Sequence, residues 1–451
     1  MISIKRFENN KFKTNEIAIF VTLKQTAENA SKNALLPAVL RRGSKNYKTQ
    51  LDISKKLEDM YGASFNCGVD KTGDYIVLKF YMETINNEYS DKKENLAQEA
   101  LNLLVDIVFN PNVENNEFNR EYVKQEKDNL AKLINSKKDD KGNYAYQRCI
   151  EEMFENDPYG IYKYGSIEEL EKIDEKNLYE YYLDVLKNSQ VNIYINGKNA
   201  KSVEINEEAN PNFKAVSERT ENEIEKIKIN SQDDKIKLQE KSENEENEIC
   251  NNIEKNKTTK NNSEESTDLD VTIENIDGKK IVKEKLDVTQ GKLIIGLNVP
   301  SENKYAVTLY NTILGGGANS KLFQNVREKA SLAYYASSRY IRRKDAIIIR
   351  TGIELPNYDK AVKVIEDQIE DMKNGKISDF EITSARTLIS SSLKLIQESQ
   401  DDIMAFDFDQ ELFNENLSFD EYYKKLEAVT LEEVIEVAKK VKTNTIYYLE
   451  K

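Results

Sequence analysis

Residues 315–335 of this 451-residue chain read GGGANSKLFQNVREKASLAYY. The three glycines break a helix predicted at 305–314, and a second helix is predicted at 320–329. Strands are predicted next, at 333–341 and 346–354. The stretch therefore predicts a unit in which two helices are followed by two strands.

The triple glycine is not a phosphate-binding loop. Residues 314–322 lack the G-x-x-x-x-G-K-[ST] spacing, and they follow a predicted helix, whereas a phosphate loop follows a strand. A tight turn that lets helices or a peptide approach the backbone closely accounts better for the glycines.

The same order of elements is predicted in the first part of the chain. Its predicted helices and strands lie at 53–61, 63–69, 75–83, 96–108, 116–135, 175–186 and 191–195. The second part continues with predicted elements at 359–374, 378–395, 431–441 and 445–449. Short stretches also correspond, such as ENNEF at 114–118 with ISDFE at 377–381. We therefore predict an α+β fold with two domains of one design, at 1–215 and 279–451.

The segment between the two predicted domains, 216–278, differs in composition. Its residues 218–277 contain 18 acidic and 9 basic side chains and no Phe, Trp or Tyr. Such a segment cannot bury enough apolar area to offset the entropy lost on ordering. We expect a flexible acidic linker, and an interaction tail is the alternative.

Composition excludes several classes of function. The chain has no histidine, so it cannot form a Ser-His-Asp triad, a Cys-His pair or a His-ligated zinc site by itself. A net charge of −14 argues against nucleic-acid binding. The three cysteines are isolated, the first ten residues show no signal-peptide pattern, and no run approaches about 18 apolar residues. We expect a cytoplasmic protein with no membrane partner.

The stretch 315–335, the sequence VTQGKL at 288–293 and the two-part layout resemble the pitrilysin/insulinase-type zinc peptidases. The resemblance covers essentially the whole chain except the acidic segment. In that family an Arg, and a Tyr seven residues later, hold the substrate backbone over a zinc ion bound by an N-terminal half. Arg327 and Tyr334 have this spacing, and their N–H and O–H donors suit a developing oxyanion. The alternative is that Arg327 pairs with Glu328 and Tyr334 packs on a sheet.

The zinc motif of the family, H-x-x-E-H, has no equivalent in this chain. The corresponding residues 34–44 read ALLPAVLRRGS. They place Ala34 and Ala38 at the ligand positions and Pro37 at the general-base position. Glu126 lies near the place of the third ligand, but one carboxylate does not hold zinc. We expect this metal site to be lost and this chain to bind no cofactor.

Some members of the family work in pairs, in which one subunit has the zinc motif and the other has the Arg and Tyr. The sequences LLPAVLRRGS (35–44) and LEDMYGASFN (57–66) resemble zinc-motif-less bacterial members whose label refers to elongation factor P modification. The resemblance implies a noncatalytic, substrate-positioning subunit of a heterodimeric peptidase, with zinc on a paralogous partner and a peptide as substrate. The alternative is a peptidase-like scaffold or binding protein without a proteolytic role. A homodimer of the isolated chain stays open.

Overall fold

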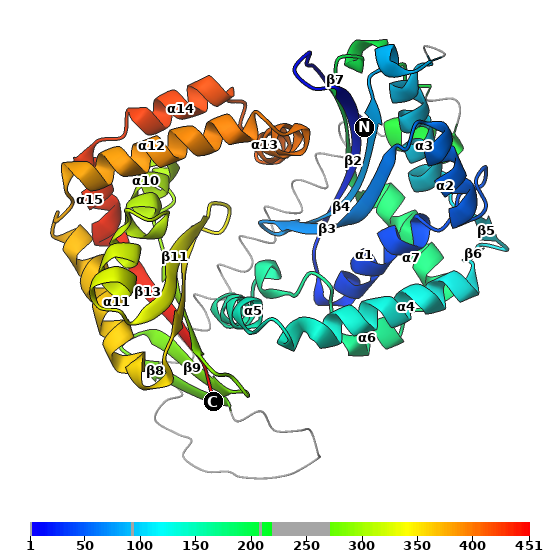
Figure 1. Ribbon diagram of the computed structural model, residues 1–451. Helices are drawn as coiled ribbons and strands as arrows, with labels where there is room; N and C mark the ends of the chain where they lie inside the picture. Colours follow the sequence, from blue (N-terminus) through cyan, green and yellow to red (C-terminus); the bar gives the residue numbers. More distant parts are fainter. Residues whose placement is uncertain (1, 92–93, 207–209, 219–270) are drawn as a thin grey trace, which may run out of the picture.

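The computed structural model describes residues 2–91, 94–206, 210–218 and 271–451. They form two halves, each a mixed sheet packed against helices, which confirms the predicted α+β fold (Figure 1). The strands of the N-terminal half are β1 (Ile2–Glu8), β2 (Thr14–Lys24), β3 (Ser64–Thr72), β4 (Tyr75–Ile85), β5 (Val113–Glu114), β6 (Glu117–Phe118) and β7 (Gln190–Gly197). Its helices are α1 (Ala27–Leu40), α2 (Gln50–Asp59), α3 (Leu96–Phe109), α4 (Arg120–Asn135), α5 (Lys141–Met153), α6 (Ile167–Glu171), α7 (Glu175–Asn188) and α8 (Pro211–Ser217).

The C-terminal half repeats this design. Its strands are β8 (Val271–Ile276), β9 (Lys279–Lys285), β10 (Gly291–Asn298), β11 (Ala333–Ile341), β12 (Ala346–Ile353) and β13 (Lys442–Glu450). Its helices are α10 (Lys304–Gly315), the π-helical turn η6 (Phe323–Lys329), α11 (Tyr358–Lys373), α12 (Asp379–Ile396), α13 (Gln400–Leu412), α14 (Phe419–Glu427) and α15 (Leu431–Lys440).

The two sheets share one strand order. The N-terminal sheet runs β1-β7-β2-β4-β3, and the C-terminal sheet contains the equivalent order β9-β13-β10-β12-β11 with β8 added at its edge. In both sheets the first two of these strands pair in parallel and the others pair antiparallel. The equivalent topology agrees with the duplication that the sequence predicted.

The expected acidic linker lies mostly outside the described residues, which omit 219–270. The described residues that follow this range form two strands, β8 and β9, joined at Asp277 and Gly278. Both of these residues have a positive φ, 52° and 74°, as a tight two-residue turn requires. The C-terminal sheet therefore begins inside the segment 216–278.

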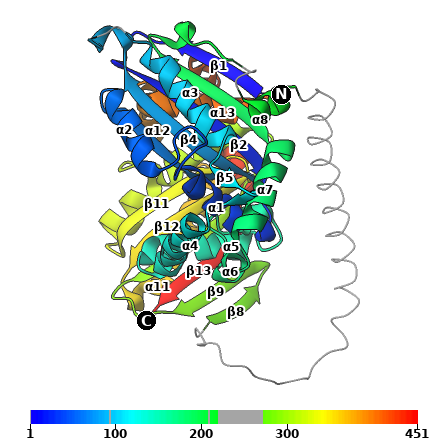
Figure 2. The same ribbon diagram turned by 90° about the vertical axis from the view of Figure 1, so that its right-hand side faces the viewer.

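The two halves exchange one helix each. Helix α5 belongs to the N-terminal half by sequence, but it packs against β10 and β13 of the C-terminal sheet (Figures 1 and 2). Helix α13 belongs to the C-terminal half, but it packs against β7 of the N-terminal sheet. The two helices follow α4 and α12 respectively, so they are equivalent elements and the exchange is reciprocal.

This exchange gives each sheet two apolar faces. Along β2, Ile17, Ile19 and Val21 face the helices of their own half, whereas Ala18 and Phe20 pack with Met404 and Phe408 of α13. The same alternation holds in β10, where Ile294 joins the cluster that contains Cys149 and Ile150 of α5. Since side chains alternate along a strand, a strand covered on both faces is apolar at consecutive positions.

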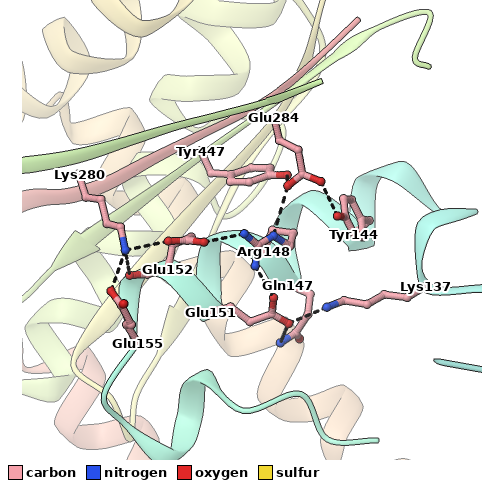
Figure 3. Close-up of polar contacts among 10 residues, drawn as sticks. All are labelled: Lys137, Tyr144, Gln147, Arg148, Glu151, Glu152, Glu155, Lys280, Glu284 and Tyr447. Atoms are coloured by element: carbon pink, nitrogen blue, oxygen red, sulfur yellow. Dashed lines mark hydrogen bonds and ion pairs between the residues drawn. The ribbon is translucent and has the colours of Figure 1, made fainter. Parts of the chain in front are cut away.

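A buried carboxylate fixes α5 on the C-terminal sheet (Figure 3). Glu284 of β9 accepts hydrogen bonds from the hydroxyl groups of Tyr144, at 2.5 Å, and Tyr447, at 2.8 Å. Arg148 of α5 adds an ion pair at 3.3 Å. Because the charge of Glu284 is fully buried, these partners offset its desolvation and fix the position of the helix.

The equivalent hairpins β3–β4 and β11–β12 also meet. Gly73, at the first turn, packs against Phe413 and Arg343, and its φ of 58° is one that glycine adopts without strain. Lys344, at the second turn, forms an ion pair with Asp74 at 2.7 Å. None of the helices in the described part of the chain combines the length and the apolar composition of a membrane span.

Candidate functional site

Arg327 lies on the π-helical turn η6 and is 42% exposed. Its guanidinium stacks on the ring of Phe323, with 4.6 Å between Cζ and the ring centroid. Its Nε lies 3.5 Å from Oε1 of Glu328, the neighbour expected as its partner in the alternative interpretation. Both charges of this pair are largely exposed, and such pairs contribute little stability. The terminal nitrogens of Arg327 therefore remain available to a ligand.

Tyr334 lies near the start of β11, the edge strand of the C-terminal sheet. Ala333 pairs with Ile353 and Tyr335 pairs with Gly352, so Tyr334 has no partner on β12 and forms a bulge. Its side chain is 53% exposed. A bulge at a sheet edge re-aims the side chain that it carries, and bulges often lie beside functional sites. The alternative, a tyrosine packed on the sheet, does not describe this residue.

The chain between Arg327 and Tyr334 is compact and irregular. Ala330 donates its N–H to the carbonyl of Asn325, five residues earlier, which closes the π-turn. Ser331 then has a φ of 53°, and Leu332 donates to the carbonyl of Val326. Element η6 packs against β11. The structure therefore brings the two predicted residues onto contacting elements, although no hydrogen bond joins their side chains.

The triple glycine allows neighbouring elements to pack closely against it. A Cβ on Gly315 would lie 2.5 Å from the backbone nitrogen of Ser338 on β11, and one on Gly317 would lie 2.9 Å from Leu388 of α12. Lys321, further along, is buried and pairs with Glu381 at 2.9 Å. These contacts agree with a tight turn that lets other elements approach the backbone closely. The stretch does not form a phosphate-binding loop.

The expected positions of the lost zinc site lie on α1. Ala34 and Ala38 are half-buried, and Pro37 is buried inside the helix. Their side chains offer no lone pair to a metal and no carboxylate to a water molecule. The Cys67 thiol lies 3.4 Å from the carbonyl oxygen of Pro37. Burial raises the pKa of this thiol to about 11, so it is not a thiolate ligand at neutral pH.

Glu126, expected near the third ligand position, is already paired. Its Oε1 lies 2.5 Å from Nε of Arg42, and the two side chains are only 12% and 20% exposed. Arg42 also donates to Gln50 at 3.1 Å and stacks on Tyr122 at 5.7 Å. Sequence reasoning missed Arg42, because its partner lies 84 residues away and no local pattern links the two.

The side chains at the expected positions of the zinc site do not fit a zinc ion. Glu126, the carboxylate expected at the third ligand position, pairs with a guanidinium, and the other expected positions carry hydrocarbon side chains. Across the described ranges, no group of three or more His, Cys, Asp or Glu side chains is placed to hold a metal ion. No reaction step on this chain is therefore assigned to a metal.

A family model and two curated proteins are similar to this chain. The family model described as "Peptidase M16 inactive domain" matches residues 239–389. The "Probable inactive metalloprotease YmfF" of Bacillus subtilis (strain 168) is 30% identical over 446 residues, which cover 98% of this chain and 94% of that protein. The "Uncharacterized zinc protease YmxG" of the same organism is 30% identical over 151 residues, covering 33% of this chain and 37% of that protein.

Solved structures show the same architecture. A conserved protein from Enterococcus faecalis V583 is 26% identical with a TM-score of 0.77, and the match covers 100% of this chain and 96% of that one. A peptidase M16 inactive domain from Pseudomonas fluorescens has a TM-score of 0.69 at 16% identity, covering 100% and 95% of the two chains, and shares the fold. The chain belongs to the peptidase M16 family, as an inactive, metalloprotease-like member.

Proposed function

We propose that this chain is the noncatalytic, substrate-positioning subunit of a heterodimeric zinc peptidase. A paralogous partner with an intact H-x-x-E-H motif would supply the zinc ion, the imidazoles and the glutamate base. Arg327 and Tyr334 of this chain would donate hydrogen bonds to the backbone of a bound peptide. The predicted link to elongation factor P modification and the cytoplasmic location stay predictions from the sequence.

One observation carries the proposal. The donors Arg327 and Tyr334 are accessible on irregular backbone of the C-terminal half, while the metal positions of the N-terminal half hold alanine and proline. A chain that only needed to fold would gain nothing from an exposed tyrosine at a bulge or from a π-turn. The two donors could act on a bound peptide if the metal-binding groups of the site lie on another chain.

The chemistry of the two side chains suits this role. A guanidinium presents several N–H donors in a fixed plane, and a phenol adds one O–H donor. Both would stabilise negative charge on the carbonyl oxygen of the bond that the partner cleaves. Neither side chain can itself activate water at neutral pH, so this chain alone is expected to cleave nothing.

The test is reconstitution with the zinc-motif paralogue, followed by zinc-dependent cleavage of short unfolded peptides. Arg327→Ala is expected to lower kcat/KM about 10²–10³-fold, as loss of one transition-state donor does. Arg120→Ala, which removes an 87% exposed arginine from α4, is the matched control and should leave kcat/KM unchanged. Unchanged cleavage in both Arg327→Ala and Tyr334→Phe would favour the scaffold alternative.

A further inference from the structure

We infer that Phe323 is a positioning residue for Arg327, a role that rests on the proposed function. The two residues are four apart on η6, and the guanidinium lies over the face of the ring at 4.6 Å. An aromatic face attracts a cation through its quadrupole. It also restricts the plane in which a guanidinium turns, since stacking and cation attraction favour the same geometry.

The surroundings of Phe323 distinguish this role from ordinary packing. The ring is half-buried, but it is not among the residues that pack against the apolar core of the C-terminal half. Val326 of the same turn is fully buried in that core, so η6 is anchored without Phe323. Among the described residues, the cation that lies over this ring is the guanidinium of Arg327.

Positioning matters here because Arg327 is otherwise weakly held. Its ion pair with Glu328 is long and exposed, and an exposed arginine loses rotamer entropy when it binds a ligand. A side chain that is ordered before binding has lost part of this entropy already. The ring of Phe323 thus acts on peptide binding through Arg327 and does not itself touch the peptide.

The experiment uses the reconstituted complex. Phe323→Leu is expected to lower kcat/KM about fivefold, equivalent to about 1 kcal/mol. Phe323→Tyr keeps an aromatic face and should retain wild-type kcat/KM. Phe380→Leu, which removes a 65% exposed aromatic ring from α12, is the matched control and should have no effect.

A double-mutant cycle separates positioning from a general structural role. In the Arg327→Gln background, Phe323→Leu should cause no further loss, because the group that it positions is absent. An equal loss in both backgrounds, or equal activity of the Leu and Tyr variants, would overturn the inference. If Arg327→Gln alone leaves kcat/KM unchanged, the proposed function fails instead.

A measurement on the isolated chain needs no activity. The Nε–H signal of Arg327 in an NMR spectrum, assigned by its loss in Arg327→Gln, should carry a ring-current shift. Phe323→Leu should remove this shift and Phe323→Tyr should keep it. An unshifted signal in the wild-type chain would contradict the stacking and the inference with it.

Discussion

The Nε of Arg42 lies 2.5 Å from Oε1 of Glu126, the residue expected from the sequence near the third zinc-ligand position. Both side chains are largely buried, so the pair is shielded from solvent. The chain lacks histidines at the expected ligand positions, and the carboxylate expected beside them has a permanent cation as its partner.

Rebuilding the motif alone should therefore fail to rebuild a tight site. The variant Ala34→His/Pro37→Glu/Ala38→His restores two imidazoles and a carboxylate, but Glu126 stays engaged by Arg42. We expect zinc to bind at least about tenfold more tightly when Arg42→Gln is added, since a ligand must be free of a competing cation. Isothermal titration with zinc measures this, and equal affinities of the two variants would contradict it.

Pro37 has a cost in stability that an alanine would remove. It lies inside α1, where proline has no N–H to donate to the carbonyl of Asn33, four residues earlier. Pro37→Ala is expected to raise the free energy of unfolding by about 1–2 kcal/mol, after allowing for the looser unfolded chain. Pro158→Ala is the control, because Pro158 is at the first turn of a 3₁₀ helix, where no N–H is needed. A lower stability of Pro37→Ala in urea unfolding would show that packing of the buried ring outweighs the backbone term.

Ser331 is predicted to need a small side chain. Its φ of 53° is in the left-handed region, which β-branched residues rarely adopt. Ser331→Gly should leave stability unchanged or raise it, whereas Ser331→Val should lower the free energy of unfolding by about 1–2 kcal/mol. Ser337→Val, at an exposed position of β11, is the matched control and should be tolerated. Equal stabilities of Ser331→Val and Ser337→Val would contradict the prediction.

The fold was predictable because each half carries its own periodic pattern, and these patterns recur in one order. The apolar run Ile17–Val21 even indicates that β2 is covered on both faces. No local sequence pattern shows which segment packs on the second face of β2. Helix α13 reaches β2 from nearly 400 residues away, so the exchange of helices depends on long-range packing.

The candidate site was predictable only in part, for similar reasons. The spacing of Arg327 and Tyr334 is a local feature, and the motif around them is specific. The helix predicted at 320–329 gave no sign of a π-turn, because its i to i+5 hydrogen bond depends on how the turn packs. Likewise, Phe323 fits an ordinary core position by sequence, and only the structure places its ring under a guanidinium.

Glu16 gives the structure a dependence on pH at the junction of the two halves. It is buried on β2, hydrogen-bonded to Asp401 of α13, and also faces Glu83 and Asp402. Burial first, and then the hydrogen bond and repulsion from these carboxylates, raise the pKa of Glu16 from 4.5 to about 9. At neutral pH the folded protein therefore keeps a proton that the unfolded chain has released.

The sign of the effect follows from this difference. Below about pH 4.5 both the folded and the unfolded state hold the proton on Glu16. The contribution of Glu16 to the free energy of unfolding is then at its maximum. As the pH rises towards 9, the unfolded state is favoured increasingly, because it releases the proton more readily. Glu16→Gln keeps a neutral donor at all pH values, so its stability relative to wild type should rise by about 1–3 kcal/mol between pH 5 and pH 9. Urea unfolding across this range measures it, with the exposed Glu58→Gln as control. Parallel pH profiles of Glu16→Gln and wild type would show that Glu16 is already ionised in the folded chain, and that the contact between α13 and β2 does not depend on its proton.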